Sequence, residues 1–475
     1  MEWGWDNARA LIGMAVIFAI AWGLSENRRA FPWRIVLGAV GIQFGFALLL
    51  FAVPPVREAL FSANIIVDAL EDATRAGTSF VFGYVGDNSA ASAIMDGDAP
   101  PLFFFQILPI VIVVAALSAM LWHWRILRWI TKGFAVVFRR GMGIGGATSL
   151  AVSANVFMGM TEAPVLVKPY LKGMTRSELF ILMTTGFATI AGSVLIIYVT
   201  FLEGVMSNPL AQLLTASIIA APAAVALALT MVPETAAKAE RAHEPDFEYE
   251  STMDAFATGA ADGLKIVLNI ATMLIAALAL LFIVNALLQW LGDVSAFSPW
   301  AEAQWIKLPS WLGILELILQ SVWAGFLWLF KILLLPFYFL NNWAGEQGLT
   351  IQVILGWVFS PLMYLIGVPW EEAARSGSLM GIKTVLTEFV AFLELAQIPA
   401  DEISPRTRII TAHAICGFAN FGSMGILIGG LTIIEPGRRD TFLQLAWKTL
   451  IAGTLATCLS GAVVGALPVD LFVRG

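Results

Sequence analysis

The sequence predicts an all-α polytopic membrane protein with about eight transmembrane helices, two re-entrant helical hairpins in an inverted repeat, and interfacial helices. Three observations predict this fold class. The chain of 475 residues is 59% hydrophobic and 13% charged, with a mean hydropathy of +0.82. Apolar runs of roughly 20 residues, the length of a membrane-crossing helix, recur along it. One unusual pattern, a carboxylate inside an apolar segment, occurs in two similar settings.

This composition excludes a soluble globular protein, because one aqueous core cannot hide so much apolar surface. The formal net charge of -7 says little, because the placement of Lys and Arg decides the topology of a bilayer protein. Nucleic acid is not an expected partner of such a protein. The only two cysteines, Cys416 and Cys458, lie in apolar segments and are expected to be packing residues rather than a disulfide or metal site. The N-terminus lacks the basic region of a cleavable signal, so the first apolar run is expected to remain as a span.

Eight apolar runs are predicted to cross the membrane. Clusters of basic residues form the loops after the first and third runs, which the positive-inside rule places in the cytoplasm. The N-terminus is then expected to be periplasmic. The runs lie at about 8–24, 35–53, 102–122, 178–202, 209–232, 264–290, 408–434 and 446–470, and the basic residues are Arg28, Arg29, Arg34, Arg125, Arg128, Lys132, Arg139 and Arg140.

Two further apolar segments, 144–172 and 378–397, are rich in Gly, Ser, Thr and Ala and suit no single span. A hairpin that enters and leaves by one face is allowed where its backbone is buried in protein or lines a cavity. Basic residues end the first hairpin on the cytoplasmic side, and three crossings separate it from the second. The two hairpins are therefore expected to enter from opposite faces.

The spans and hairpins divide the chain into five predicted parts. An interfacial helix is expected at 56–85, where charges are mixed with apolar positions at helical spacing, and another is expected at 349–370. The first three parts are scaffold spans at 1–100; the first transport half at 101–232, with a hairpin near 140–172 and a broken helix near 178–202; and a cytoplasmic linker and scaffold span at 233–290. The fourth part is an insertion at 291–348, expected to be periplasmic or interfacial, with an interfacial or membrane-dipping helical pair in 295–345. The fifth part is 349–475, with a hairpin near 371–397, a broken helix near 406–434 and the last span.

The repeated pattern predicts one shared site. Its first copy runs from Thr161-Glu162 to Gly186-Phe187-Ala188 and Gly192-Ser193, and its second runs from Thr387-Glu388 to Gly417-Phe418-Ala419 and Gly422-Ser423. A charge buried in a bilayer costs a few kcal/mol or more and is kept when it contacts something. Duplicated halves that meet at a midplane site are typical of secondary transporters.

These motifs resemble the concentrative nucleoside transporter family. The resemblance rests on Asn155 to Pro164, Gly186 to Ser193, Glu388 to Phe392 and Cys416 to Phe421, and it extends from about residue 10 to the C-terminus outside 295–345. It implies a secondary active symporter that imports nucleosides across the bacterial inner membrane. It also implies a homotrimer, surrounded by membrane lipid, whose transport domain moves past a scaffold like an elevator.

The resemblance also implies which residues bind the substrate. The first hairpin would contact the nucleobase and the second hairpin and its broken helix would hold the ribose, with an aromatic ring packed on the ligand. Carboxylates and amides can pair with a diol or a base edge, and a dry pocket makes each unmatched group costly. The expected residues are Met160, Thr161, Glu162, Val194, Thr387, Glu388, Phe418, Asn420 and Ser423.

Two of these positions depart from the family pattern. Met160 stands where the family usually carries Gln, and Thr387 stands where it usually carries Asn. A thioether is only a weak acceptor and cannot read a base edge with any strength. An atypical nucleoside, or another small polar metabolite, therefore stays open as the substrate.

The family's sodium site corresponds here to the side chains of Asn155 and Thr189 and the backbone carbonyls of Met158 and Ile190. Hard cations prefer oxygen ligands, which unwound backbone can supply. No other metal or cofactor is expected. A proton on Glu162 or Glu388 is the competing coupling ion, because a buried carboxylate takes up a proton more readily than an exposed one.

Other interpretations compete with the transporter. The glutamates could form structural ion pairs with Lys168, Lys383 or an arginine. An intramembrane enzyme could use Glu162 and Glu388 as acid and base, but no nucleophile elbow, zinc-binding pair or Asp-rich motif is present. A channel or a receptor on the same scaffold is a third class. His413 is expected to be a packed, hydrogen-bonded residue, and 143–146 is expected to be a turn.

Overall fold

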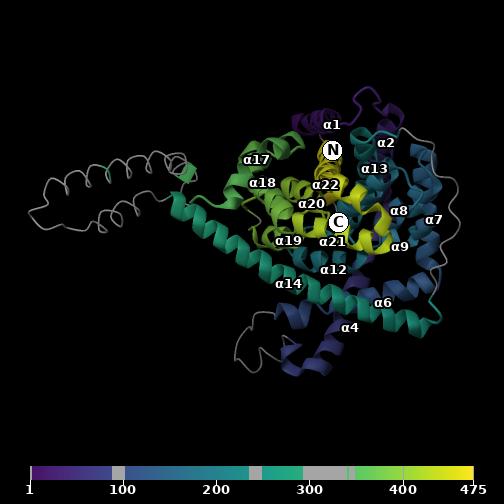
Figure 1. Cartoon of the computed structure of the whole chain (residues 1–475). Helices are drawn as coiled ribbons and strands as arrows, with labels where there is room; N and C mark the ends of the chain where they lie inside the picture. Colours follow the sequence, from purple (N-terminus) through teal and green to yellow (C-terminus); the bar gives the residue numbers. More distant parts are fainter. Residues whose placement is uncertain are drawn as a thin grey trace, which may run out of the picture.

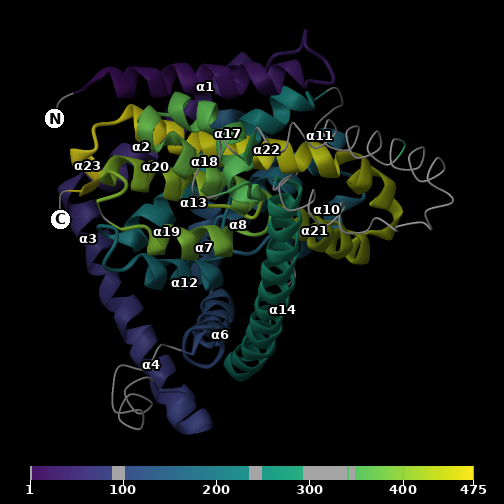
Figure 2. The same cartoon turned by 90° about the vertical axis from the view of Figure 1, so that its left-hand side faces the viewer.

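The computed structural model describes residues 3–87, 102–234, 249–292, 348–399 and 401–473, with 322, 340 and 341 as isolated positions. Every regular element within these ranges is a helix, so the predicted all-α class is confirmed. The helices form a bundle, and the long helix α14 (Thr252–Gly292) runs along one side of it (Figures 1 and 2). The helix pair predicted in 295–345 and the central linker 235–248 lie outside the described residues.

Seven helices in the described part of the chain are long and apolar enough to cross a membrane. The eighth predicted run, 408–434, consists instead of two shorter helices, α20 (Pro405–Ile415) and α21 (Phe421–Ile434), so the count of eight stays a prediction. The seven are α1 (Trp5–Gly23), α2 (Trp33–Ala52), Phe103–His123 with η2 (Phe103–Ile107) and α6 (Ile110–His123), Arg176–Leu202 with α11 (Arg176–Ala188) and α12 (Gly192–Leu202), α13 (Pro209–Met231), Thr252–Leu291 within α14, and Pro436–Ala466 with η5 (Pro436–Arg438) and α22 (Arg439–Ala466).

The two segments that were predicted to be interfacial helices are helical in the structure. The segment 56–85 forms α3 (Pro54–Ser62), α4 (Asn64–Phe82) and η1 (Gly83–Val85), and 349–370 forms α17 (Ile351–Leu365). A final turn of helix, α23 (Asp470–Val473), ends the described chain. Their positions relative to a bilayer stay predictions.

The basic segment after the third run is a helix rather than the expected loop. This helix, α7 (Ile126–Met142), buries Thr131, Phe138 and Met142 on one face and leaves its basic residues largely exposed. The high density of charge concealed this helical periodicity in the sequence. Gly143 ends α7 with a φ of +65°, a left-handed conformation that favours glycine, so the first hairpin begins later than expected, with α8 at Gly146.

The two halves of the transport region share one plan. In the first, α8 (Gly146–Asn155) leads to a non-helical tip, α9 (Ala163–Leu166) and α10 (Lys168–Leu171), and the next helix is broken between α11 and α12. In the second, α18 (Trp370–Val385) and α19 (Glu388–Gln397) are joined by a tip at Leu386 and Thr387, and the next helix is broken between α20 and α21. The predicted duplication is thus present, while the re-entrant placement of the tips stays a prediction.

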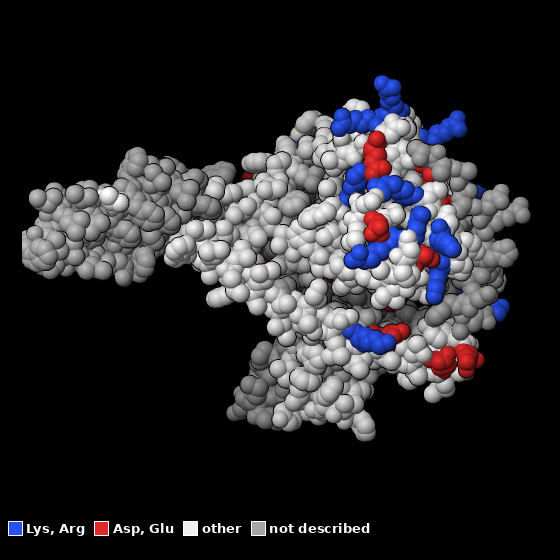
Figure 3. Space-filling model, viewed as in Figure 1, with Lys and Arg blue, Asp and Glu red and all other residues white. Residues whose placement is uncertain are grey.

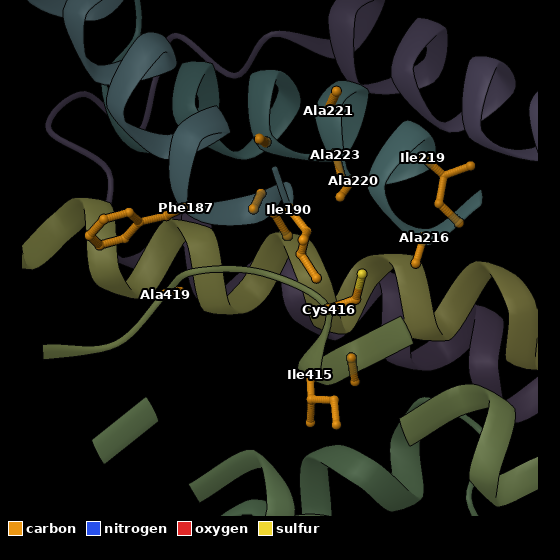
Figure 4. Packing of buried hydrophobic residues seen from close by; sticks show 14 of the residues in the cluster. Phe187, Ile190, Ala216, Ile219, Ala220, Ala221, Ala223, Ile415, Cys416 and Ala419 are labelled. Carbon is orange, nitrogen blue, oxygen red and sulfur yellow. The ribbon is translucent and has the colours of Figure 1, made fainter. Parts of the chain in front are cut away.

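The two helix breaks meet in the core, against alanine-rich α13 and against α22 (Figure 4). A Cβ atom on Gly417 would lie 2.7 Å from the carbonyl oxygen of Phe187, and one on Gly453 would lie 2.7 Å from the Cβ of Phe187. Gly417 in the repeated motif therefore permits a close approach of the two backbones. Cys416 and Cys458 are buried as predicted, and the His413 ring bonds the carbonyl of Ile409 through Nδ1 at 2.9 Å.

The surface is suited to an apolar surrounding. On the face shown in Figure 3, charged side chains gather in one part, and most of the rest of the described surface is uncharged. Large apolar side chains on α14 are open in the single chain, with Ile275 74% and Phe282 75% exposed. Such exposure is unusual for a soluble monomer and agrees with a membrane protein.

Candidate functional site between the hairpin tips

A cavity of about 190 Å³ lies between the two hairpin tips and the two helix breaks. The structure brings together all nine residues that were predicted to contact the substrate. The residues from the first half are Met160, Thr161, Glu162 and Val194, and those from the second half are Thr387, Glu388, Phe418, Asn420 and Ser423.

Glu388 is the most tightly held polar group of this cavity. Its side chain is 6% exposed, Tyr198 donates its hydroxyl to Oε1 at 2.9 Å, and Asn420 donates Nδ2 to Oε2 at 2.8 Å. The Tyr198 ring stacks on Phe392 with their centroids 4.5 Å apart. Both oxygens of Glu388 are therefore fixed, and each keeps lone pairs that a ligand hydroxyl can use.

Two polar residues in the second half also cap helices at the cavity. Thr387 accepts the backbone N–H of Val390 through Oγ1 at 3.3 Å, and Asn420 accepts that of Ser423 through Oδ1 at 2.7 Å. Thr and Asn are favoured N-cap residues because their side chains satisfy first-turn amides. As a result, α19 and α21 both begin at the cavity, where the positive ends of their dipoles favour electron-rich ligand atoms.

Glu162 lies at the open side of the cavity. It is exposed, as is Thr161, and its Oε2 accepts the backbone N–H of Gly159 at 3.2 Å. It occupies the N-cap position of α9 without a side-chain cap bond. Its carboxylate is thus accessible to a ligand.

The structure does not support the ion-pair interpretation of the two glutamates. Within the residues that the structure describes, neither Glu162 nor Glu388 makes an ion pair. Lys383 is fully buried, but its Nζ donates to Thr457 Oγ1 at 2.9 Å. The hydrogen-bond donors of Glu388, Tyr198 and Asn420, are neutral, and Lys383 acts on the Glu388 carboxylate electrostatically without a hydrogen bond between them in the described residues.

The predicted sodium residues meet at the junction of the first tip and the first helix break. Asn155 is fully buried, and neither atom of its amide has a hydrogen-bond partner in the described part of the chain. Thr189 donates its hydroxyl to the Asn155 carbonyl at 2.7 Å, which leaves lone pairs on Oγ1. Met158 and Ile190 lie in the non-helical segments that follow Asn155 and Thr189.

This donor set fits a hard monovalent cation. An unpaired buried amide costs about 1–3 kcal/mol, and a cation at the Asn155 oxygen would remove part of that cost. The two segments are also joined directly, because Gly192 donates its N–H to the carbonyl of Phe157 at 3.0 Å. An ion at this junction would link the first tip to the first helix break.

Sequence reasoning missed two parts of the cavity wall. Tyr198 lies four residues after Val194, and this spacing on α12 was the signal that could have found it. The other part is a face of α14 formed by Ile266, Asn269, Ile270, Met273 and Leu274. Its three- and four-residue spacing indicates a helix face, but nothing in the sequence indicates what that face covers.

Three family profiles match most of the chain. They are described as Na+ dependent nucleoside transporter C-terminus over residues 212–465, Na+ dependent nucleoside transporter N-terminus over 12–85, and nucleoside recognition (Gate) over 104–204. The three matches cover both hairpins, both helix breaks and α14.

Similar proteins span the whole chain. An uncharacterized transporter of Haemophilus influenzae is 35% identical over 96% of both chains. Sodium/nucleoside cotransporter 1 of Rattus norvegicus is 33% identical over 96% of this chain and 63% of its own length. The structure of CNTnw in an inward-facing substrate-bound state is 32% identical, with a TM-score of 0.79 and 97% of each chain covered.

Proposed function

This chain belongs to the Na+-dependent nucleoside transporter family, and we propose that it is a symporter that imports nucleosides across a bacterial inner membrane. It is a transporter and not an enzyme. The observation that carries the proposal is the single cavity lined by all nine predicted residues from both halves of the transport region.

In this proposal the two ends of the cavity bind different parts of a nucleoside. Glu388, Asn420 and Ser423 form a buried end with fixed acceptors and amide donors, which suits the hydroxyl pair of a ribose. Thr161 and Glu162 form the open end and would pair with the base edge. Phe418 offers an apolar surface for the ligand between them.

We take sodium as the coupling ion, because the family is Na+ dependent and the Asn155 amide has no hydrogen-bond partner among the residues that the structure describes. An ion held by Asn155 and Thr189 would fix the first tip, and therefore Thr161 and Glu162, against α12. Binding of ion and substrate would then strengthen each other by the same factor. Proton coupling through Glu162 or Glu388 is the competing mechanism.

The proposal includes elevator movement within a homotrimer. Movement is supported by the location of the cavity, whose wall combines the hairpin halves with α14. Assembly is supported by the open apolar side chains of α14, such as Ile275 and Phe282, which lipid or a second copy could cover. The N-terminus would face the periplasm.

A second candidate substrate, a different small polar metabolite, is favoured by Met160. This side chain is 8% exposed and lines the cavity next to Thr161. A thioether offers the base little hydrogen bonding, so base selectivity would depend on Thr161 and Glu162 alone in the first hairpin.

Uptake into liposomes tests the proposal. We expect the purified full chain to concentrate radiolabelled uridine or adenosine against its gradient when sodium is applied outside. Choline would abolish uptake, and chromatography would recover the substrate unchanged. If a pH gradient drives uptake in choline, the coupling ion is the proton rather than sodium. Equilibration without concentration would indicate a channel, and chemical conversion would contradict transport altogether.

A further inference from the structure

A helix outside the duplicated halves completes the cavity. The face of α14 formed by Ile266, Asn269, Ile270, Met273 and Leu274 lines it, and Asn269 is the only polar residue of that face. We propose that Asn269 contacts the transported nucleoside directly and helps to determine which nucleosides bind. This inference rests on the proposed function and extends it to a residue outside the hairpins and helix breaks.

The position of Asn269 along α14 places it between the two ends of the cavity. Towards the start of the helix, the carboxylate of Asp262 interacts electrostatically with that of Glu162. Towards its end, the methyl group of Met273 would lie 2.7 Å from a Cβ atom on Gly422, beside Asn420. With a rise of 1.5 Å per residue, Asn269 lies about 10 Å beyond Asp262 and about 6 Å before Met273.

The chemistry of Asn269 favours contact with a ligand. Its side chain is exposed and forms no hydrogen bond with any residue in the ranges that the structure describes. The other members of the face are apolar, so they give this amide nothing to pair with. A ligand that fills the cavity would displace water from this amide, and leaving the amide unpaired would then cost affinity. An amide both donates and accepts, and either a base edge or a ribose hydroxyl can match it.

Packing of α14 makes this contact different from those of the hairpins. The helix is seated on α6 through two glycines, because a Cβ atom on Gly259 would lie 2.8 Å from the carbonyl oxygen of Ala115 and one on Gly263 would lie 2.7 Å from the Cα of Ile112. The other polar wall residues are carried by α12, the hairpin tips and α21. A nucleoside in the cavity would therefore bridge two separately supported units, and Asn269 is its polar contact on the α14 side.

Binding measurements on the purified full chain test this inference. The variants are Asn269→Leu, which removes the amide; Asn269→Gln, which keeps it; and the control Thr272→Val. Thr272 is exposed on the same helix, and its hydroxyl donates to the carbonyl of Leu268 at 2.8 Å. Ligands are uridine, adenosine, and analogues that lack single hydroxyls or carry a methylated base edge, all in saturating sodium.

We expect Asn269→Leu to weaken binding of the preferred nucleoside by about threefold to tenfold, the effect of one hydrogen bond. The analogue that lacks the group hydrogen-bonded to Asn269 should bind wild type and Asn269→Leu with equal affinity. Asn269→Gln should recover part of the affinity. Thr272→Val should match wild type, and the sodium concentration at half-saturation, measured without nucleoside, should be the same in all four proteins.

Three results would overturn the inference. If Asn269→Leu binds every ligand as tightly as wild type while Glu388→Gln does not, Asn269 makes no contact and the proposed function stands. An equal loss for all analogues, or a similar loss in Thr272→Val, would show an effect of helix packing only. If wild type binds no nucleoside at all, the proposed function fails and this inference fails with it.

Discussion

The two hairpin tips have similar sequences but hold their glutamates differently. Glu388 is 6% exposed and accepts hydrogen bonds from Tyr198 and Asn420, whereas Glu162 is exposed and, among the described residues, accepts only a backbone N–H from Gly159. The second tip and its helix break are capped by the side chains of Thr387 and Asn420. At the first tip and break, α9 and α12 begin without a side-chain cap bond.

This difference teaches that one duplicated motif can serve two purposes. The polar side chains of the second half are hydrogen-bonded to one another and to the backbone, so they are already in place before a ligand arrives. This lowers the entropy cost of ordering them on binding. The first half retains an accessible carboxylate at Glu162 and an amide at Asn155 that has no hydrogen-bond partner within the described ranges. We expect the second half to supply rigid recognition and the first half to respond to the coupling ion.

The largest expected effect is a contrast between Glu388→Gln and Glu162→Gln. At residue 388 the new amide group would face the donors of Tyr198 or Asn420, and charge-assisted hydrogen bonds of about 1.5–3 kcal/mol each would be lost. We expect nucleoside binding to weaken about 100-fold or more, with a lower melting temperature. Glu162→Gln should weaken binding about tenfold at most and leave the melting temperature unchanged, since Glu162 makes a single local bond.

Isothermal titration and thermal unfolding of both variants in detergent measure this contrast. Size-exclusion chromatography shows whether each variant remains folded. Equal losses of affinity and of melting temperature in the two variants would mean that the tips are equivalent, contrary to the comparison.

A smaller effect is expected from Asn155→Ala, which sharpens the role of the first half. Removal of the amide should raise the sodium concentration for half-maximal stabilisation by about tenfold, since one oxygen ligand is lost. In choline the variant should melt no lower than wild type, because the deleted group has no protein partner in the described chain.

Thermal unfolding across a sodium titration checks this expectation. The matched control is Thr184→Val, which also removes a buried unpartnered polar atom but lies within α11, before the break. An unchanged sodium response in Asn155→Ala, or an equal change in Thr184→Val, would remove Asn155 from the ion site.

The smallest effect should come from Tyr198→Phe. The ring and its stacking on Phe392 are kept, one donor to Glu388 is lost, and Asn420 still holds the other oxygen. We expect nucleoside affinity to fall about threefold to tenfold with little change in sodium dependence. Binding titrations of this variant against wild type measure the change, and unaltered affinity would show that Glu388 needs no support from Tyr198.

The sequence allowed the lining residues of the site to be predicted, but not the helix α7 or the additional wall residues Tyr198 and Asn269. Carboxylates in apolar segments and the repeated glycine motifs indicated one shared site, because both patterns conflict with an ordinary span, and the family resemblance of these motifs implied the lining residues. The helix α7 was missed because its dense basic residues suggested a loop. Tyr198 was missed because an aromatic residue in an apolar helix is not distinctive, and Asn269 because an isolated amide within a span has no partner in the sequence.

The sequence alone determined the membrane class, the two unusual segments and the chemistry available to them, since composition and local pattern fix where a chain can be helical and where charge is buried. Only the tertiary structure decided that Glu388 would be enclosed and Glu162 accessible, that the Asn155 amide would have no partner in the described part of the chain, and that α14 would close the cavity. These outcomes depend on contacts between helices far apart in the chain, and no local pattern specifies which faces meet.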